Sequence, residues 1–272
     1  MKKTACYLLL VMFLSGCVSH AQRTELASQL AHAGQLQAVE YGSSTFNLAG
    51  FQRINQHRQD IRIYIEGDGR AWLRPGRRST DPTPGNPVAL KLAALDSADN
   101  VIYLARPCQY IGLRSASRCH SDYWTHKRFS DEVIRAYDEV LDQLQARMQG
   151  VNFHLIGFSG GGAVAVLLAA RRNDIASIST IAGNLDPNAL NHDRGFSPLL
   201  GSLDPLSSAK SNRQIPQRHF YGLRDQVIPS WVAKNYSAFS PECASTIEAD
   251  ASHRAGWEVV WLKHLRRLPQ CK

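Results

Sequence analysis

The sequence predicts an α/β protein with a mostly parallel sheet of about eight strands, helices on both faces and only a short cap segment. Short β-branched runs, at 61–65, 151–156 and 175–181, alternate with segments whose apolar residues have helical spacing. This alternation is typical of a parallel sheet that helices cover on both faces. The 272 residues suit one medium domain, and no apolar run reaches the roughly 18 residues of a membrane-spanning helix.

The first residues have the pattern of an export signal. Lys2 and Lys3 precede an apolar stretch over 7–14, and Leu14-Ser-Gly-Cys17 follows. This ending resembles a bacterial lipobox, so we expect a lipoprotein signal peptide over 1–16 and an acylated Cys17 as the mature N-terminus. An ordinary signal that happens to contain a cysteine is the alternative. The resemblance implies export and a lipid anchor, with attachment to the outer membrane facing the periplasm, since Val18 rather than an aspartate follows Cys17.

The formal net charge is +8, and it falls to +6 once Lys2 and Lys3 are removed with the signal. The excess is scattered, and its densest part is the segment 69–78 with four arginines. Nucleic-acid binding is therefore disfavoured. Attraction to anionic lipid headgroups explains the excess at least as well.

The elements follow in order along the chain. Residues 17–34 are expected to form a linker with a marginal helical pattern, before one folded domain over 35–272. Strands are expected at 36–40, 46–53, 61–65 and 101–104, with a loop rich in Arg, Pro and Gly at 69–87 and a helix at 88–95.

The second half begins with the clearest helix, for which Ser130 is a suitable N-cap and Gly150 the end. Strands are then expected at 151–156, 175–181, 218–221 and 244–247, and helices at 163–170, 231–239 and 257–268. Residues 183–213 are rich in Asn, Asp, Ser, Pro and Gly, which predicts a short irregular cap rather than a large lid.

The first candidate catalytic motif is Gly157-Phe-Ser159-Gly-Gly161, which fits the pattern G-x-S-x-G. The pattern alone is weak, because it arises often by chance. Here it follows a predicted strand and opens a predicted helix, as a nucleophile elbow requires. We therefore expect Ser159 to be a nucleophile, with a structural Gly-rich turn as the alternative.

A serine hydroxyl needs an imidazole to take its proton and a carboxylate to hold that imidazole. His253 lies in a loop between the last predicted strand and the last predicted helix, where the base belongs. Asp225 follows the strand that ends at Tyr221 and is the expected acid. Asp186, after the preceding strand, is the alternative acid or a simple turn residue.

With these residues in place, the chain resembles exported α/β-hydrolase lipoproteins of Gram-negative bacteria, whose substrates are largely unassigned. The resemblance covers almost all of the mature chain and implies the α/β-hydrolase fold. It is carried by Glu66-Gly-Asp-Gly69, Arg106-Pro-Cys-Gln109, Tyr123-Trp124, Gly157 to Gly161, Gly183-Asn-Leu-Asp186 and His253.

An oxyanion hole needs two backbone N–H groups aimed at the developing charge. Gly160 should supply one, and Asp68, with Gly69 as the alternative, the other. Related enzymes have a His-Gly motif in this loop, whereas this chain has Glu66 and a carboxylate at Asp68. Both are departures from the pattern.

Cysteine usage agrees with export. Beyond Cys6 and Cys17 there are four cysteines, and nearness in sequence favours the pairs Cys108–Cys119 and Cys243–Cys271. Four free buried thiols are the alternative.

Together these features predict a serine hydrolase that cleaves a carboxylic ester through an acyl-enzyme on Ser159. A peptidase or amidase with the same triad and a non-catalytic envelope binding lipoprotein are the alternatives. Arg70 and Trp72 are candidate substrate contacts, and the short cap favours short, soluble esters. No cofactor is expected, and no His-Glu-x-x-His or Cys-x-x-Cys spacing suggests a metal.

Overall fold

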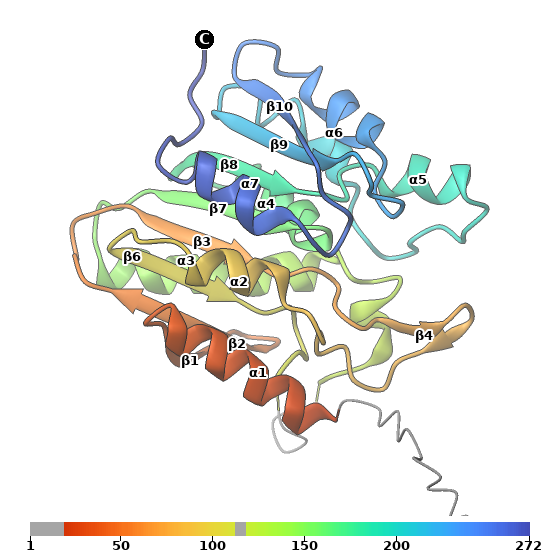
Figure 1. Ribbon diagram of the computed structural model, residues 1–272, viewed down its shortest axis with the longest axis horizontal. Helices are drawn as coiled ribbons and strands as arrows, with labels where there is room; N and C mark the ends of the chain where they lie inside the picture. Colours follow the sequence, from red (N-terminus) through yellow and green to blue (C-terminus); the bar gives the residue numbers. More distant parts are fainter. Residues whose placement is uncertain (1–18, 112–117) are drawn as a thin grey trace, which may run out of the picture.

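The computed structural model describes residues 19–111 and 118–272, so the expected signal peptide and Cys17 lie outside the described residues. An eight-stranded sheet runs through it in the order β1-β2-β6-β3-β7-β8-β9-β10 (Figure 1). The strands are β1 (Gln37–Gly42), β2 (Asn47–Ile54), β3 (Ile61–Ile65), β6 (Asn100–Leu104), β7 (Phe153–Phe158), β8 (Ile175–Ile181), β9 (Gln217–Gly222) and β10 (Ala244–Ala249). Neighbouring strands in the part β6-β3-β7-β8-β9-β10 pair in parallel, whereas β2 pairs antiparallel with both β1 and β6. The predicted fold class is confirmed.

Helices cover both faces of this sheet, and each face has its own hydrophobic core. One core contains α3 (Asp131–Arg147), α4 (Gly160–Ala169) and α6 (Ser230–Ser237). The other contains α1 (His20–Ala33), α2 (Val88–Ala94) and α7 (Trp257–His264). Strand β3 shows the alternation: Ile63 and Ile65 point to the first core, and Tyr64, between them, points to the second.

Helix α1 corrects the expected linker over 17–34. Ser19 and Gln22 form a reciprocal capping box, with hydrogen bonds of 3.2 and 2.7 Å. The buried face consists of Arg23, Ala27 and Ala31, and it packs beside α2. These small and charged residues give a weak apolar pattern, and packing on the domain stabilises the helix instead.

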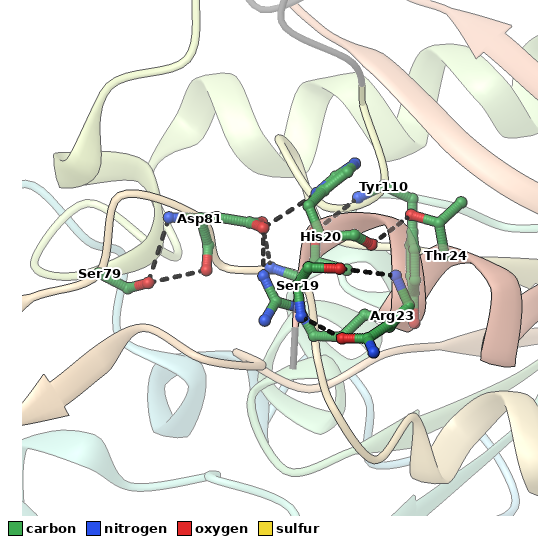
Figure 2. Close-up of polar contacts among 9 residues, drawn as sticks. Ser19, His20, Arg23, Thr24, Ser79, Asp81 and Tyr110 are labelled. Carbon is green, nitrogen blue, oxygen red and sulfur yellow. Dashed lines mark hydrogen bonds and ion pairs between the residues drawn. The ribbon is translucent and has the colours of Figure 1, made fainter. Parts of the chain in front are cut away.

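Polar contacts hold the beginning of α1 to the loop before α2. His20 Nδ1 lies 2.9 Å from Asp81 Oδ2, and the Arg23 guanidinium also donates to that oxygen (Figure 2). Asp81 Oδ1 accepts the Thr83 N–H at 2.9 Å. Burial alone would raise the pKa of Asp81, but hydrogen bonds from Thr83, His20 and Arg23 lower it to about 2.

Three smaller differences concern local structure. The loop over 69–87 contains a hairpin, β4 (Trp72–Arg74) and β5 (Arg77–Arg78), and a 3-10 turn, η1 (Ser121–Trp124), lies beside it. The expected irregular cap contains α5 (Pro187–Asp193) and the 3-10 turn η2 (Pro205–Ser208). Ser130 precedes α3, but its side chain makes no capping bond and its Oγ is buried with no partner among the described residues.

Both expected disulfides, Cys108–Cys119 and Cys243–Cys271, are present. Their ends are 11 and 28 residues apart in sequence. Among residues 19–111 and 118–272, no helix has the length and apolar character needed to cross a bilayer.

Candidate active site

Ser159 lies in a sharp turn between β7 and α4. Its backbone has φ 50° and ψ −117°, in the left-handed half of conformational space where a side chain is strained. The flanking glycines make the turn possible: a Cβ on Gly157 would lie 2.3 Å from the Gly161 carbonyl oxygen, and one on Gly161 would lie 2.2 Å from the Ile65 carbonyl oxygen. The turn presents the Ser159 side chain at the carboxyl edge of the sheet.

The three residues expected to act together are hydrogen-bonded in a chain. His253 Nε2 lies 3.1 Å from Ser159 Oγ, and His253 Nδ1 lies 2.8 Å from Asp225 Oδ2. The Asp225 side chain is fully buried, and its Oδ1 accepts the N–H groups of Val227 and Ile228 at 2.7 and 2.9 Å. With both oxygens engaged, the carboxylate has a fixed orientation toward the imidazole.

Asp186 is not part of this chain. It precedes α5, where its Oδ1 accepts the Ala189 N–H at 3.0 Å as an N-cap. The structure therefore brings Asp225, and not Asp186, to His253.

The loop after β3 lies directly against Ser159. A Cβ on Gly67 would lie 2.9 Å from the Phe158 ring and 3.3 Å from Ser159 Cβ. A Cβ on Gly160 would lie 2.0 Å from Asp68 Oδ1, so the Asp68 carboxylate covers the beginning of α4. As the first residue of α4, Gly160 has an N–H without an intrahelical acceptor.

Two arginines that sequence reasoning did not assign lie on the Asp68 carboxylate. Arg106 Nη1 donates to Asp68 Oδ1 at 2.8 Å, and Arg128 Nε lies 3.4 Å from Oδ2. Both guanidinium groups stack on the Phe129 ring, with 5.5 and 5.4 Å to its centroid. The Arg106 side chain is only 4% exposed, so the carboxylate is balanced by a largely desolvated charge.

Gln109 completes the support of this loop. Its Nε2 donates to the Gly67 carbonyl oxygen at 3.0 Å, and its Oε1 accepts the Arg106 N–H at 3.1 Å. Arg106 and Gln109 both belong to a motif noted in the sequence, but the motif alone does not show what they contact.

Glu66, which the sequence marks as a departure from a His-Gly motif, begins the same loop. Its Oε1 accepts the N–H groups of Gly67 and Ala89 at 2.8 and 3.4 Å, and its Oε2 accepts the Tyr103 hydroxyl at 3.2 Å. Burial raises the pKa of Glu66 to about 7, although these donors act in the opposite direction.

Comparison with known proteins concerns the fold on which this geometry is built. No protein-family model matches the chain, and no curated protein sequence is similar enough to be a relative. Solved structures do match over most of its length. An esterase from Pyrococcus furiosus has a TM-score of 0.60 at 14% identity, over 85% of this chain and 89% of that one. The chain has the α/β-hydrolase fold.

Two other solved structures match over a similar share of this chain. Est1E from Butyrivibrio proteoclasticus has a TM-score of 0.59 at 13% identity, over 85% of this chain and 96% of that one. A membrane phospholipase A, described as a bacterial virulence factor, has a TM-score of 0.57 at 14% identity, over 91% and 92%. At such identities the similarity concerns the fold alone.

The expected substrate contacts lie at the same edge of this α/β-hydrolase fold. Trp72 is 45% exposed on hairpin β4–β5, and the Arg70 N–H donates to the Pro82 carbonyl oxygen at 2.9 Å. Neither has a recorded contact with Ser159 or His253 among the described residues. Within the described ranges, no three His, Cys, Asp or Glu side chains are grouped as a metal site would need.

Proposed function

We propose that this protein is a serine hydrolase that cleaves a carboxylic ester through an acyl-enzyme on Ser159. One observation carries the proposal: a serine at a strained strand-to-helix turn is hydrogen-bonded to an imidazole, which is hydrogen-bonded to a buried carboxylate. Each member needs the next, because a serine hydroxyl is a weak nucleophile on its own.

In the proposed first step, Ser159 Oγ attacks the ester carbonyl while His253 Nε2 takes its proton. Asp225 holds the Nδ1–H of His253, which fixes the tautomer and stabilises the imidazolium that forms. The tetrahedral intermediate then collapses, His253 returns the proton to the departing alcohol, and the acyl group remains on Ser159. Water, activated by His253, attacks the acyl-enzyme in the second step and releases the acid.

The oxyanion would be held by the N–H groups of Gly160 and Asp68. A negative Asp68 side chain beside this position would oppose the developing charge. The two guanidinium groups on that carboxylate, from Arg106 and Arg128, reduce this opposition. We therefore assign them an indirect part in the reaction, through the loop that bears the oxyanion donor.

An ester is preferred, and an amide or peptide remains the second candidate because the same residues act on both. The proposal includes an acylated Cys17 as the mature N-terminus and attachment to the outer membrane facing the periplasm. A protein that only binds a ligand on this fold would have no need for all three hydrogen-bonded residues.

A fluorophosphonate probe tests the proposal most directly, because it reacts with an activated serine and needs no knowledge of the substrate. Wild-type protein should be labelled at Ser159, and Ser159→Ala should lose both labelling and the hydrolysis of ester substrates. Ser179→Ala, at a serine on the neighbouring strand β8, is a matched control that should retain both. Failure of the wild type to label would exclude an activated serine, and labelling of another serine would exclude Ser159.

A further inference from the structure

Three loops at the carboxyl edge of the sheet, the edge at which Ser159 lies, expose apolar side chains. We define the rim as residues 70–78, 194–202 and 223–228, which follow the carboxyl ends of β3, β8 and β9. Hairpin β4 and helix α5 project from this edge of the sheet in Figure 1. Of the eleven large hydrophobic side chains that are exposed among the described residues, six belong to the rim: Trp72, Leu73, Phe196, Leu200, Leu223 and Val227. Exposed apolar residues gathered in this way mark an interaction surface.

Hydrogen bonds and packing join the three loops around the site. Arg194 Nη2 donates to the Gln226 carbonyl oxygen at 2.7 Å, which joins the second loop to the third. Ser202 Oγ donates to the His126 carbonyl oxygen at 2.7 Å, and Arg78 Nη1 donates to Asp122 Oδ1 at 2.9 Å. The 121–129 segment therefore connects the second loop to the hairpin.

The rim is also strongly basic. It contains six arginines, at 70, 74, 77, 78, 194 and 224, and one carboxylate, Asp225, whose side chain is fully buried against His253. Arg78 and Arg224 are paired with Asp122 and Asp250 outside the rim. The remaining charge favours an anionic partner, and the aliphatic residues favour one with an apolar interior. A bilayer of anionic lipids combines both properties, whereas a nucleic acid is anionic but has no apolar interior for exposed leucines.

Helix α1 gives a second indication, which rests on the acylated Cys17 of the proposed function. Cys17, the proposed lipid site, lies two residues before Ser19, and two residues span at most about 7 Å. Figure 2 shows His20 and Arg23, at the beginning of α1, beside Asp81, and His20 Nδ1 lies 2.9 Å from Asp81 Oδ2. The next residue, Pro82, accepts the N–H of Arg70 at the base of the hairpin. An anchor at Cys17 would therefore hold this side of the domain, and the rim with it, near the membrane surface.

We propose that the rim docks on an anionic lipid bilayer, with its apolar side chains among the headgroups and its arginines on lipid phosphates. If Ser159 also hydrolyses esters, which rests on the proposed function, its substrate is an amphiphilic ester that enters from the bilayer. Such a substrate differs from the short, soluble esters that the short cap predicts.

Docking is tested with a polarity-sensitive dye on single cysteines of the full chain. Leu200→Cys places the dye on the rim, where the native side chain is 73% exposed. Leu262→Cys is the matched control, at a leucine that is 51% exposed on α7. With vesicles of phosphatidylglycerol and phosphatidylethanolamine, fluorescence at position 200 should rise severalfold and shift to the blue, while position 262 stays unchanged. Arg74→Gln with Arg77→Gln should weaken the response at least threefold, and so should high salt.

Other outcomes overturn the proposal. Equal responses at positions 200 and 262, or no response at position 200, would exclude docking through the rim. A response that needs no vesicles and grows with protein concentration would show that a second copy of this chain covers the rim. The dye signal does not depend on catalysis, so docking without hydrolysis of any ester would reject the proposed function and leave the membrane surface in place.

Discussion

Glu66 offers the sharpest test of the structure, because its carboxyl group is buried, with only 1% of the residue exposed. We consider Glu66→Gln, which keeps the shape of the side chain and removes its ionisation. The side-chain oxygen that accepts the N–H groups of Gly67 and Ala89 can be retained by the amide. The variant should therefore fold, and its stability should respond to pH differently from that of the wild type.

The size of the difference follows from the two pKa values. Glu66 has a pKa of 4.5 when unfolded and about 7 when folded. Below pH 4.5 the carboxyl group is protonated in both the folded and the unfolded state, and the free energy of unfolding has its full value. As the pH rises toward 7 the unfolded chain loses its proton first, so the wild type loses free energy of unfolding. The total loss is about 3 kcal/mol, from roughly 1.4 kcal/mol for each pH unit between the two values.

Equilibrium unfolding in urea, followed by fluorescence between pH 4.5 and 8 with the disulfides intact, measures this difference. The free energy of unfolding of the wild type should fall relative to that of Glu66→Gln by about 3 kcal/mol up to pH 7, and the gap should then stay constant. Glu242→Gln, at an exposed glutamate, is the control and should run parallel to the wild type. Parallel curves for Glu66→Gln and the wild type would refute the assignment of a raised pKa to this buried group.

Three further predictions concern the site and its attachment. Asp225→Asn should lower kcat about 10⁴-fold, because it favours the wrong imidazole tautomer, whereas Asp186→Asn should leave kcat nearly unchanged and cost at most about 1 kcal/mol of stability; the reverse ranking in steady-state assays would reject Asp225 as the acid. Arg106→Gln should lower kcat at least tenfold, because it removes the nearer and more buried of the two guanidinium groups on the Asp68 carboxylate, and adding Asp68→Asn should restore much of it; absence of rescue would contradict the charge balance. Mass spectrometry of the protein from Gram-negative envelopes should find an acylated Cys17 at the N-terminus, and a soluble, unacylated main form would contradict the lipid anchor.

The central sheet and the elbow could be predicted because their signals are local. Strands β3, β6 and β8 are short runs rich in β-branched residues, and the turn around Ser159 needs small residues at fixed spacing. The same holds for His253 and Asp225, since each occupies a loop that follows a recognisable strand. Helix α1 has no such local signal, because its buried positions are Arg23, Ala27 and Ala31, which form no apolar stripe.

The support of the loop after β3 could not be predicted for a different reason. Arg106 lies 38 residues from Asp68, and the sequence contains many arginines with equal claim to that carboxylate. Only the folded chain shows which guanidinium is buried beside it. The carboxylate at Asp68 was visible as a departure, and a negative charge near an expected oxyanion hole is a reason to look for a basic partner.

The Cys243–Cys271 disulfide closes a covalent ring of chain that contains β10, His253 and α7. Strand β10 is at the edge of the sheet, where it pairs only with β9, so the part of the chain that bears the base of the proposed triad has strand pairing on one side alone. In the entropic account, a disulfide across 28 residues lowers the conformational entropy of the unfolded chain and thereby stabilises the folded state by about 3.5 kcal/mol. Reduction of this disulfide should therefore destabilise the part of the chain that bears His253, and we expect the proposed hydrolysis to be weaker wherever thiols are kept reduced.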